Sequence, residues 1–276
     1  MLFPNEGFAG EAMPVAIHAI LNDVRTAGAI AWEMQQRLSF SEREYKSDES
    51  VVTEADHRIE EFLCQRIAAE FPAANIISEE AKRPFDPEKP LTFAVDPIDG
   101  TDVYSQGMTG WCISVGLLDE HLVPTAGIIF APRLDLLLVA DAESGATLNG
   151  APLPSIGLPE SISIRSNLMV TSRIHKHLDL RGFVGKIRGI GSAALHLCYP
   201  LLYAAVIGAL EGPGAHIWDI AAAHAINRAR DGDLVYLNGE KIDYRPLTDG
   251  RRAQDVIMGG HPLIVGQLRQ VLRRLD

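Results

Sequence analysis

Two aspartates separated by a short turn form the segment best suited to chemistry. Asp96 and Asp99 follow Phe93–Val95, an apolar stretch typical of a buried strand, and Pro97-Ile98 forms a turn that brings them together. Ionised carboxylates this close repel each other and raise each other's pKa unless a cation lies between them. Oxygen ligands favour Mg²⁺ over zinc, and the backbone carbonyl of Ile98 can add a ligand. The segment therefore predicts a magnesium site.

Backbone N–H groups beside this turn can bind a phosphate. Gly100-Thr101 begins an expected helix directly after Asp99, and the N–H groups at a helix N-terminus attract anions. Metal ligands and phosphate would then meet at one turn. The simpler alternative is an Asx turn, in which Asp96 and Asp99 only cap the following helix.

Four more acids can join this pair. Glu79 and Glu80 end the preceding strand, so a neighbouring strand would place them beside Asp96. Asp219 and Asp56 each lie in the first turn of an expected helix, where an acid can equally be a simple favourable charge at the helix terminus. Together these positions allow acids from distant segments to converge.

The elements that must position these acids begin with two helices and a group of strands. Apolar residues at helical spacing predict a helix over residues 14–44 and a second over 54–70. The later strands follow one another too closely for crossover helices, which indicates an antiparallel sheet that closes with a turn at Asn149-Gly150. The expected strands are 75–78, 91–95, 111–118, 122–130 and 134–140.

From about residue 160 the pattern changes to strands alternating with helices, as in an α/β lobe. We therefore expect a mixed α+β and α/β fold in one domain, residues 1–276, with an antiparallel-sheet lobe at about 1–150 and an α/β lobe at 151–276. The expected elements are strands at 168–171, 205–210, 234–237 and 256–258, a helix after Ser192, a helix over 218–229 and a final helix to Leu275.

Composition excludes several classes of protein. The chain has 276 residues, 47% of them hydrophobic, but no apolar run of the roughly 20 residues that a membrane helix needs. The start of the chain also lacks the features of a signal peptide, so we expect a cytoplasmic protein. A net charge of −11 argues against a nucleic-acid partner. Cys64, Cys112 and Cys198 are widely separated, which favours reduced core residues over disulfides or a zinc site.

Several motifs together resemble the inositol monophosphatase superfamily over nearly the whole chain. The most specific are Asp-Pro-Ile-Asp-Gly-Thr and Trp-Asp. The resemblance implies a layered αβαβα sandwich of the sugar phosphatase type and a Mg²⁺-dependent phosphatase that acts on a small phosphate ester. The matching segments are Val52–Asp56, Glu79-Glu80, Asp96–Thr101, Gly145–Gly150, Arg188–Ala194 and Trp218–Ala222.

The resemblance also implies roles for individual residues. Two or three Mg²⁺ ions would be bound per site, with Asp96 bridging two of them. Thr101 with Glu79 would activate a water, and Asp56 would hold water close by. The implied metal ligands are Glu79, Asp96, the Ile98 carbonyl, Asp99 and Asp219. The implied substrate contacts are Asp99, Gly100, Thr101, Gly191, Ser192, Ala193, Glu211 and Asp219.

Some positions depart from the family's pattern. Ser78 stands where the family usually has glycine, and Asp102 where members often have threonine, arginine or lysine. Glu211 resembles the family's sugar-contacting glutamate, but the segment from it to His216 is one residue longer than usual. Lys46 matches a family lysine near the mouth of the site, and His216 matches a histidine near it.

Other functions are also compatible with the sequence. Asp96 could be a covalent nucleophile, as in haloacid-dehalogenase-like phosphatases, but those enzymes separate their two acids by one residue, not by two. A metal-binding relative without turnover is the non-enzymatic alternative. An inositol or sugar phosphate is the favoured substrate, with 3′-phosphoadenosine 5′-phosphate and histidinol phosphate as alternatives. A homodimer and inhibition by Li⁺ are implied only by the resemblance.

Overall fold

A seven-stranded sheet supports the segments that carry most of the predicted acids. The computed structural model describes residues 14–38, 44–45, 51–81, 83–141, 144–154, 157 and 161–275. Neighbouring strands of this sheet are antiparallel except for the first pair, which is parallel, so the predicted antiparallel block is confirmed. In spatial order the strands are β3 (Ala74–Ser78), β4 (Leu91–Asp99), β5 (Cys112–Leu118), β6 (Pro124–Ala131), β7 (Leu136–Asp141), β8 (Gly145–Leu148) and β9 (Ala151–Pro152).

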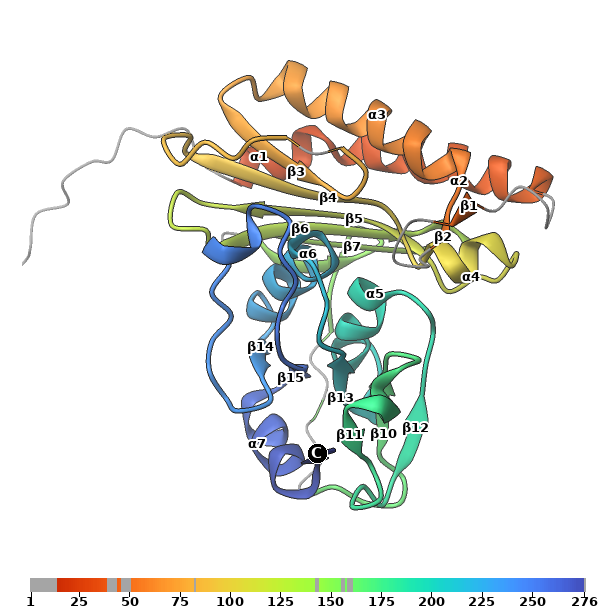
Figure 1. Ribbon diagram of the computed structural model, residues 1–276, viewed down its shortest axis with the longest axis vertical. Helices are drawn as coiled ribbons and strands as arrows, with labels where there is room; N and C mark the ends of the chain where they lie inside the picture. Colours follow the sequence, from red (N-terminus) through yellow and green to blue (C-terminus); the bar gives the residue numbers. More distant parts are fainter. Residues whose placement is uncertain are drawn as a thin grey trace, which may run out of the picture.

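Helices cover both faces of this sheet. The N-terminal helices α2 (Leu21–Arg37) and α3 (Glu54–Glu70) lie over one face and bury Val24, Ile59 and Leu63 against it, as Figure 1 shows. On the opposite face, α5 (Ala193–Cys198) and α6 (Ile217–Arg228) lie between this sheet and a second one. α6 is buried around most of its circumference because it contacts both sheets.

The second sheet has five strands and a helix on its outer face. Two parallel pairs, β12–β10 and β10–β13, are followed by the antiparallel pairs β13–β15 and β15–β14. Outside it lies α7 (Pro262–Val271), whose Ile264 and Leu268 pack in a cluster with sheet residues. The layers thus run helix, sheet, helix, sheet, helix, which confirms the predicted sandwich. The strand order is β12 (Lys186–Arg188), β10 (Asn167–Val170), β13 (Val206–Glu211), β15 (Ile257–Gly260) and β14 (Asp233–Tyr236).

Smaller elements complete the described chain. No helix in the described ranges is long and apolar enough to cross a membrane. These elements are helices α1 (Pro14–Ala19) and α4 (Thr101–Ser105), strand pairs β1 (Glu44–Tyr45) with β2 (Val51–Val52) and β11 (Leu178–Asp179) with β16 (Arg273–Arg274), and the 3-10 turns Pro132–Leu134, Ile174–Lys176, Tyr199–Leu201 and Arg245–Leu247.

Two predicted helix boundaries are wrong. The helix expected over 14–44 is interrupted at Ile20 and ends at Arg37, with Leu38 in an extended conformation. Leu38 is also the last apolar residue at helical spacing. The predicted helix therefore extended to residues beyond 38, where the apolar spacing needed to pack it against the sheet does not continue. The final helix ends at Val271 instead of Leu275, because Arg273-Arg274 pairs as a strand with β11.

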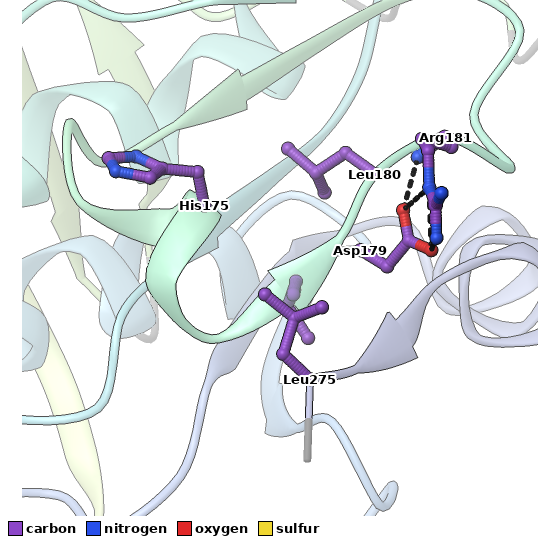
Figure 2. A pocket seen from close by; sticks show the side chains of 6 residues that line it. His175, Asp179, Leu180, Arg181 and Leu275 are labelled. Atoms are coloured by element: carbon purple, nitrogen blue, oxygen red, sulfur yellow. Dashed lines mark hydrogen bonds and ion pairs between the residues drawn. The ribbon is translucent and has the colours of Figure 1, made fainter.

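A shallow groove beside this strand pair is remote from the predicted chemistry. It is close to 390 Å³ in volume, and Arg181 and Asp179 form an ion pair of 2.6 Å at its edge (Figure 2). None of the predicted site residues lines it. The lining residues are His175, Leu178, Asp179, Leu180, Arg181 and Leu275.

Two glycines let α6 approach the first sheet closely. Gly116 and Gly127 are opposite each other on β5 and β6, and the backbone of α6 at Ala221 and Ala222 lies over them. A Cβ added at Gly127 would lie 2.6 Å from the Ala222 carbonyl oxygen, and one added at Gly116 would lie 2.7 Å from the Ala222 nitrogen. These glycines therefore set the depth of the helix whose first turn carries Asp219.

We expect Gly127→Ala to destabilise the fold. The added methyl group meets backbone and cannot be relieved by a rotamer change, so we expect the free energy of unfolding to fall by about 1–3 kcal/mol. Urea denaturation measures this change. Gly266→Ala is the control, since a Cβ there meets open space. Equal stability of Gly127→Ala and wild type would contradict this packing.

A buried histidine links α6 to β14. The ring of His224 lies 2.9 Å from the Tyr244 hydroxyl through Nδ1 and 2.7 Å from Asp233 through Nε2. Burial lowers the pKa of His224 from 6.5, and Asp233 opposes that shift. The folded state therefore favours the neutral ring, in which Nε2–H donates to Asp233 and Nδ1 accepts from Tyr244.

This arrangement predicts a loss of stability in acid. Because the pKa of His224 is lower in the folded state, the unfolded chain binds a proton more readily than the folded protein does. The contribution of His224 to the free energy of unfolding is therefore complete above the pKa of an unfolded histidine, about 6.5, and falls as the pH drops below that value. The stability difference between wild type and His224→Gln should shrink between about pH 8 and about pH 5. Denaturation at several pH values measures it, with the exposed His175→Gln as control. A difference independent of pH would exclude this role.

Candidate active site

A bulge at the end of β4 brings its two aspartates to the same edge of the sheet. Asp96 pairs with Ser114 and Asp99 with Cys112, so β4 contains one more residue than β5 between these pairs. The Asp96 carboxylate accepts a hydrogen bond of 3.0 Å from the Ile98 N–H, and Gly100 turns the chain with a φ of +94°. Both carboxylates are buried, with 2% and 6% exposure.

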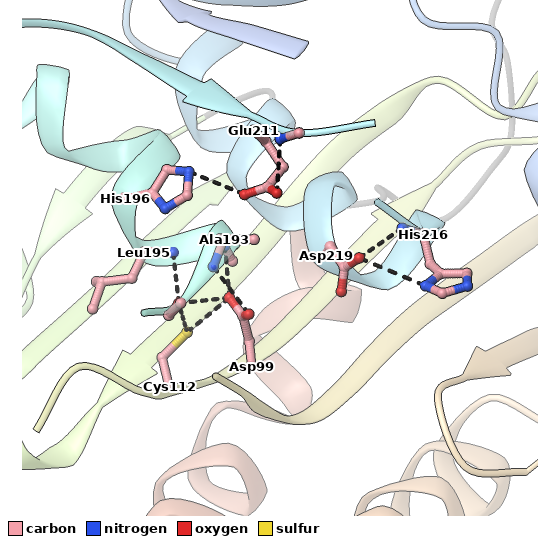
Figure 3. Close-up of polar contacts among 11 residues, drawn as sticks. Asp99, Cys112, Ala193, Leu195, His196, Glu211, His216 and Asp219 are labelled. Atoms are coloured by element: carbon pink, nitrogen blue, oxygen red, sulfur yellow. Dashed lines mark hydrogen bonds and ion pairs between the residues drawn. The ribbon is translucent and has the colours of Figure 1, made fainter. Parts of the chain in front are cut away.

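The first turn of α6 adds a third carboxylate. Asp219 Oδ2 accepts a hydrogen bond of 2.6 Å from the His216 N–H, which fixes the side chain at the helix start. One carboxylate oxygen from each of Asp96, Asp99 and Asp219 lies within 4.8 Å of the others. Figure 3 shows Asp99 and Asp219 projecting from different elements in the same region. The predicted convergence of these three acids is present in the structure.

The electrostatics of this cluster suit a divalent cation. Burial raises the pKa of Asp96 well above its usual range, and the charges of Glu79, Asp99, Asp219 and Asp56 raise it further. Burial and Asp219 also raise the pKa of Asp99, to about 7. Desolvated carboxylates that repel one another are stabilised by a cation, and an all-oxygen donor set fits a hard ion such as Mg²⁺.

Glu79 reaches the cluster from β3. This strand is parallel to β4 with Ser78 beside Val95, so Glu79, the first residue after β3, follows on the side of Asp96. Glu79 is the strongest charged neighbour acting on the pKa of Asp96. Glu80, in contrast, donates its backbone N–H over 2.6 Å to the buried carboxylate of Glu60. The two consecutive glutamates are thus placed by different contacts.

Asp56 joins α3 to the turn after β4. Its Oδ2 accepts hydrogen bonds from the N–H and hydroxyl of Thr53, at 2.8 and 2.6 Å, in a capping box at the start of α3. Its Oδ1 lies 2.9 Å from the Thr101 hydroxyl, which also lies 3.0 Å from the Ile98 carbonyl. Burial raises the pKa of Asp56 despite these hydrogen bonds. The pairing of Thr101 with Glu79 stays a prediction.

The start of α5 holds the Asp99 carboxylate. The Ser192 hydroxyl donates to Asp99 Oδ2 over 2.5 Å, and the N–H groups of Ala193 and Ala194 donate to the same carboxylate over 3.0 and 2.6 Å. Sequence reasoning assigned Ser192 and Ala193 to the substrate and did not identify Ala194. The sequence signal that could have identified Ala194 is its position two residues after a helix-capping serine, because backbone N–H groups in the first turn of a helix have no partner within the helix.

Cys112 is a second neighbour of Asp99 that sequence reasoning placed only in the core. Its sulfur lies 3.8 Å from Asp99 Oδ2 and 3.3 Å from the Ser192 hydroxyl, and the residue is fully buried. Burial, followed by the charge of Asp99, raises the pKa of this thiol well above its usual range. The neutral thiol therefore belongs to the environment of Asp99.

The remaining predicted residues have varied surroundings. Glu211 ends β13 and lies 3.1 Å from His196 (Figure 3). His216 stacks on Trp218 with ring centroids 4.5 Å apart. The exposed Asp102 accepts a hydrogen bond from Gln106 within its own helical turn. Gly191 adopts a φ of +117° beside Val103, next to Ser192. Lys46 lies outside the described residues.

Comparisons with known proteins identify the family of this chain. The family model described as the inositol monophosphatase family matches residues 14–271. Inositol monophosphatase 1 of Solanum lycopersicum is 30% identical over 211 residues, which cover 72% of this chain and 77% of that protein. A 3′(2′),5′-bisphosphate nucleotidase, CysQ of Buchnera aphidicola, is 28% identical over 230 residues, or 80% of this chain and 84% of that protein.

A solved structure shares the fold at lower sequence identity. The IMPase of Thermotoga maritima superposes with a TM-score of 0.76 at 23% identity, covering 94% of this chain and 96% of that one. The predicted superfamily, sandwich fold and enzyme class, the phosphoric monoester hydrolases, are thus confirmed. The chain belongs to the inositol monophosphatase family.

Proposed function

We propose that the protein hydrolyses a phosphate monoester of a small polyhydroxylated metabolite, an inositol or sugar phosphate, with the help of Mg²⁺. The observation that carries this proposal is the convergence of Asp96, Asp99 and Asp219 within 4.8 Å. Two of these acids are buried and have raised pKa values, so the protein maintains an arrangement that is unfavourable without a cation.

The donor set suggests which residues would hold the ions. One Mg²⁺ would be bound by Glu79, Asp96 and the Ile98 carbonyl. A second would be bound by Asp96, Asp99 and Asp219. The proposal allows a third Mg²⁺ and assigns no ligands to it. When bound, Mg²⁺ supplies positive charge that makes a nearby water more acidic and stabilises the phosphoryl oxygens. The hydrogen bonds from Ser192, Ala193 and Ala194 keep the Asp99 carboxylate oriented toward that role.

Thr101 is suited to orient the attacking water. Its hydroxyl has one proton, and both acceptors in reach, Asp56 Oδ1 and the Ile98 carbonyl, compete for it. The Thr101 oxygen is then left to accept a hydrogen bond from water. Glu79 would accept the second proton of that water, while Asp56 anchors Thr101. Water would attack phosphorus directly as Glu79 takes its proton, the P–O bond to the alcohol would break, and the alcohol oxygen would take up a proton from solvent, so no phosphoenzyme is expected.

The substrate would contact several backbone groups around the cluster. The contacts that the resemblance assigns to it are Asp99, Gly100 and Thr101 around the start of α4, Gly191, Ser192 and Ala193 at the start of α5, and Glu211 and Asp219. The similarity to a bisphosphate nucleotidase keeps 3′-phosphoadenosine 5′-phosphate as a second candidate. Histidinol phosphate is a third candidate substrate, and metal binding without turnover is the competing non-enzymatic function.

A substrate panel tests this proposal. The purified protein would be assayed for phosphate release from inositol monophosphate, fructose 1,6-bisphosphate, histidinol phosphate and 3′-phosphoadenosine 5′-phosphate, each with Mg²⁺ and with a chelator. We expect Mg²⁺-dependent turnover, fastest with an inositol or sugar phosphate. Absence of turnover on all four esters and on a generic aryl phosphate would refute it. The same preparation tests two properties that the resemblance implies, a homodimer by light scattering and inhibition by Li⁺. A cytoplasmic location is a separate proposal.

A further inference from the structure

A buried glutamate on α3 holds the turn that follows β3. The Glu60 carboxylate is 4% exposed, and its Oε2 accepts a hydrogen bond of 2.6 Å from the Glu80 N–H. The hydroxyl of Ser78, the last residue of β3, also hydrogen-bonds to this carboxylate. Glu60 therefore contacts the residue before and the residue after Glu79, which is one of the proposed Mg²⁺ ligands.

Arg83 joins this network from the far end of the turn. Its Nη1 lies 3.0 Å from the Ser78 hydroxyl oxygen and 2.9 Å from the Cys64 sulfur. Because Arg83 donates to the hydroxyl, the single Ser78 proton is left for an acceptor. The Glu60 carboxylate takes it, with the Ala81 carbonyl oxygen, at 3.4 Å, as the more distant alternative. Strand pairing with β4 ends at Ser78, and beyond it these contacts connect the chain to α3.

Glu60 lies on the same buried face of α3 as Asp56, one helical turn further along. This helix lies over β3 and β4, as Figure 1 shows. A buried carboxylate costs free energy unless it is hydrogen-bonded, and burial raises the pKa of Glu60 while the Glu80 N–H opposes that shift. Asp56 uses its carboxylate to hold Thr101, at the turn after β4. The face thus carries two buried acids, each of which holds a different turn of the proposed active site.

We propose that Glu60 is a positioning residue that fixes the turn after β3, so that the Glu79 carboxylate is held toward the Mg²⁺ ion that it would share with Asp96. Glu60 itself would bind neither metal nor substrate. The ion assigned to Asp99 and Asp219 should not depend on it. This inference rests on the proposed function, because it adds a supporting residue to the metal site on which that function depends.

Binding of Mn²⁺ to the metal-free protein tests this role without any turnover. Mn²⁺ suits the same oxygen ligands as Mg²⁺, and electron paramagnetic resonance measures the free ion during a titration. We expect Glu60→Leu to weaken binding of one ion about tenfold and to leave the other unchanged, since loss of a group behind a metal ligand commonly has an effect of this size. Glu60→Gln keeps a carbonyl oxygen for the Glu80 N–H and should restore most of the affinity. Glu61→Leu, at the exposed neighbouring glutamate, is the matched control.

A double-mutant cycle with Glu79→Gln identifies the residue through which Glu60 acts. If it acts through Glu79, adding Glu60→Leu to Glu79→Gln should weaken Mn²⁺ binding little further. Circular dichroism checks the folding of each variant. Ser78→Ala, which removes the second contact of the same network, should weaken the same ion to a smaller extent and tests the role even if Glu60→Leu does not fold.

The possible results separate the positioning role from the proposed function. Unchanged Mn²⁺ affinity in folded Glu60→Leu, an equal loss for both ions, or additive effects in the double variant would each overturn the positioning role. Wild-type protein that binds no Mn²⁺ would refute the metal site and the positioning role together. Mn²⁺ binding that depends on Glu60, in protein that hydrolyses no ester, would refute the phosphatase proposal and support the positioning role.

Discussion

Asp96→Asn is expected to reduce kcat for phosphate release by at least about a hundredfold while the protein remains folded. Loss of a single group that organises charge stabilisation at an active site commonly has an effect of this size. Asp96 is the proposed bridging ligand, and an amide carries no charge to bind two cations. Its oxygen can still accept the hydrogen bond from the Ile98 N–H, so the turn should persist.

The stability of this variant separates a functional loss from misfolding. The substitution Asp96→Asn removes one of several buried like charges, so the metal-free variant should be at least as stable as the metal-free wild type. Circular dichroism and thermal denaturation measure this. Asp249→Asn is the control, because this exposed aspartate pairs with Arg251 at the surface and should leave turnover unchanged when it is replaced. Full turnover in Asp96→Asn would contradict the assigned role.

Removal of divalent cations is expected to abolish activity and lower the thermal midpoint, and Mg²⁺ should restore both. A ligand that binds only the folded state stabilises it by about 2.7 kcal/mol at a hundred times its dissociation constant. Here the bound charge would also offset the burial and the repulsion from Asp219 that together raise the pKa of Asp99 to about 7. Differential scanning fluorimetry with and without chelator measures this shift.

Two comparisons make the chelation experiment specific. Ca²⁺ should raise the thermal midpoint less than Mg²⁺ does, because the proposed site suits Mg²⁺, which demands a smaller and more regular set of oxygen ligands. Asp96→Asn should lose most of the Mg²⁺-induced rise in thermal midpoint, whereas Asp249→Asn should keep it. Undiminished turnover in chelator-treated protein would show that the cluster serves another purpose.

The position of the acids could be predicted because each lies at the end of a recognisable element. Glu79 and Asp96 follow apolar strands, and the parallel pairing of those strands places them side by side. Asp219 follows a tryptophan at the start of an alanine-rich segment. Alanine is small, so a helix rich in it can be buried between two sheets. Local patterns were sufficient here because the chemistry lies at element ends.

Contacts between segments far apart in the chain could not be predicted. The hydrogen bonds from Ser192, Ala193 and Ala194 to Asp99 join positions more than 90 residues apart, and the sequence alone gives no register between them. The contact of Gly116 and Gly127 with α6 is equally non-local. The end of the last helix depends on β-pairing of Arg273 with Asp179, which overrides its local helical preference.

The claim that Asp96, Asp99 and Asp219 bind divalent cations is tested most directly by X-ray diffraction from crystals of the protein grown with Mn²⁺ in place of Mg²⁺. Anomalous scattering would locate the ions without any assumption about turnover. We predict at least two strong peaks, one on each side of the Asp96 carboxylate, with Asp219 coordinating one of them. A map from Mn²⁺-saturated crystals with no peak beside these three carboxylates would contradict the account.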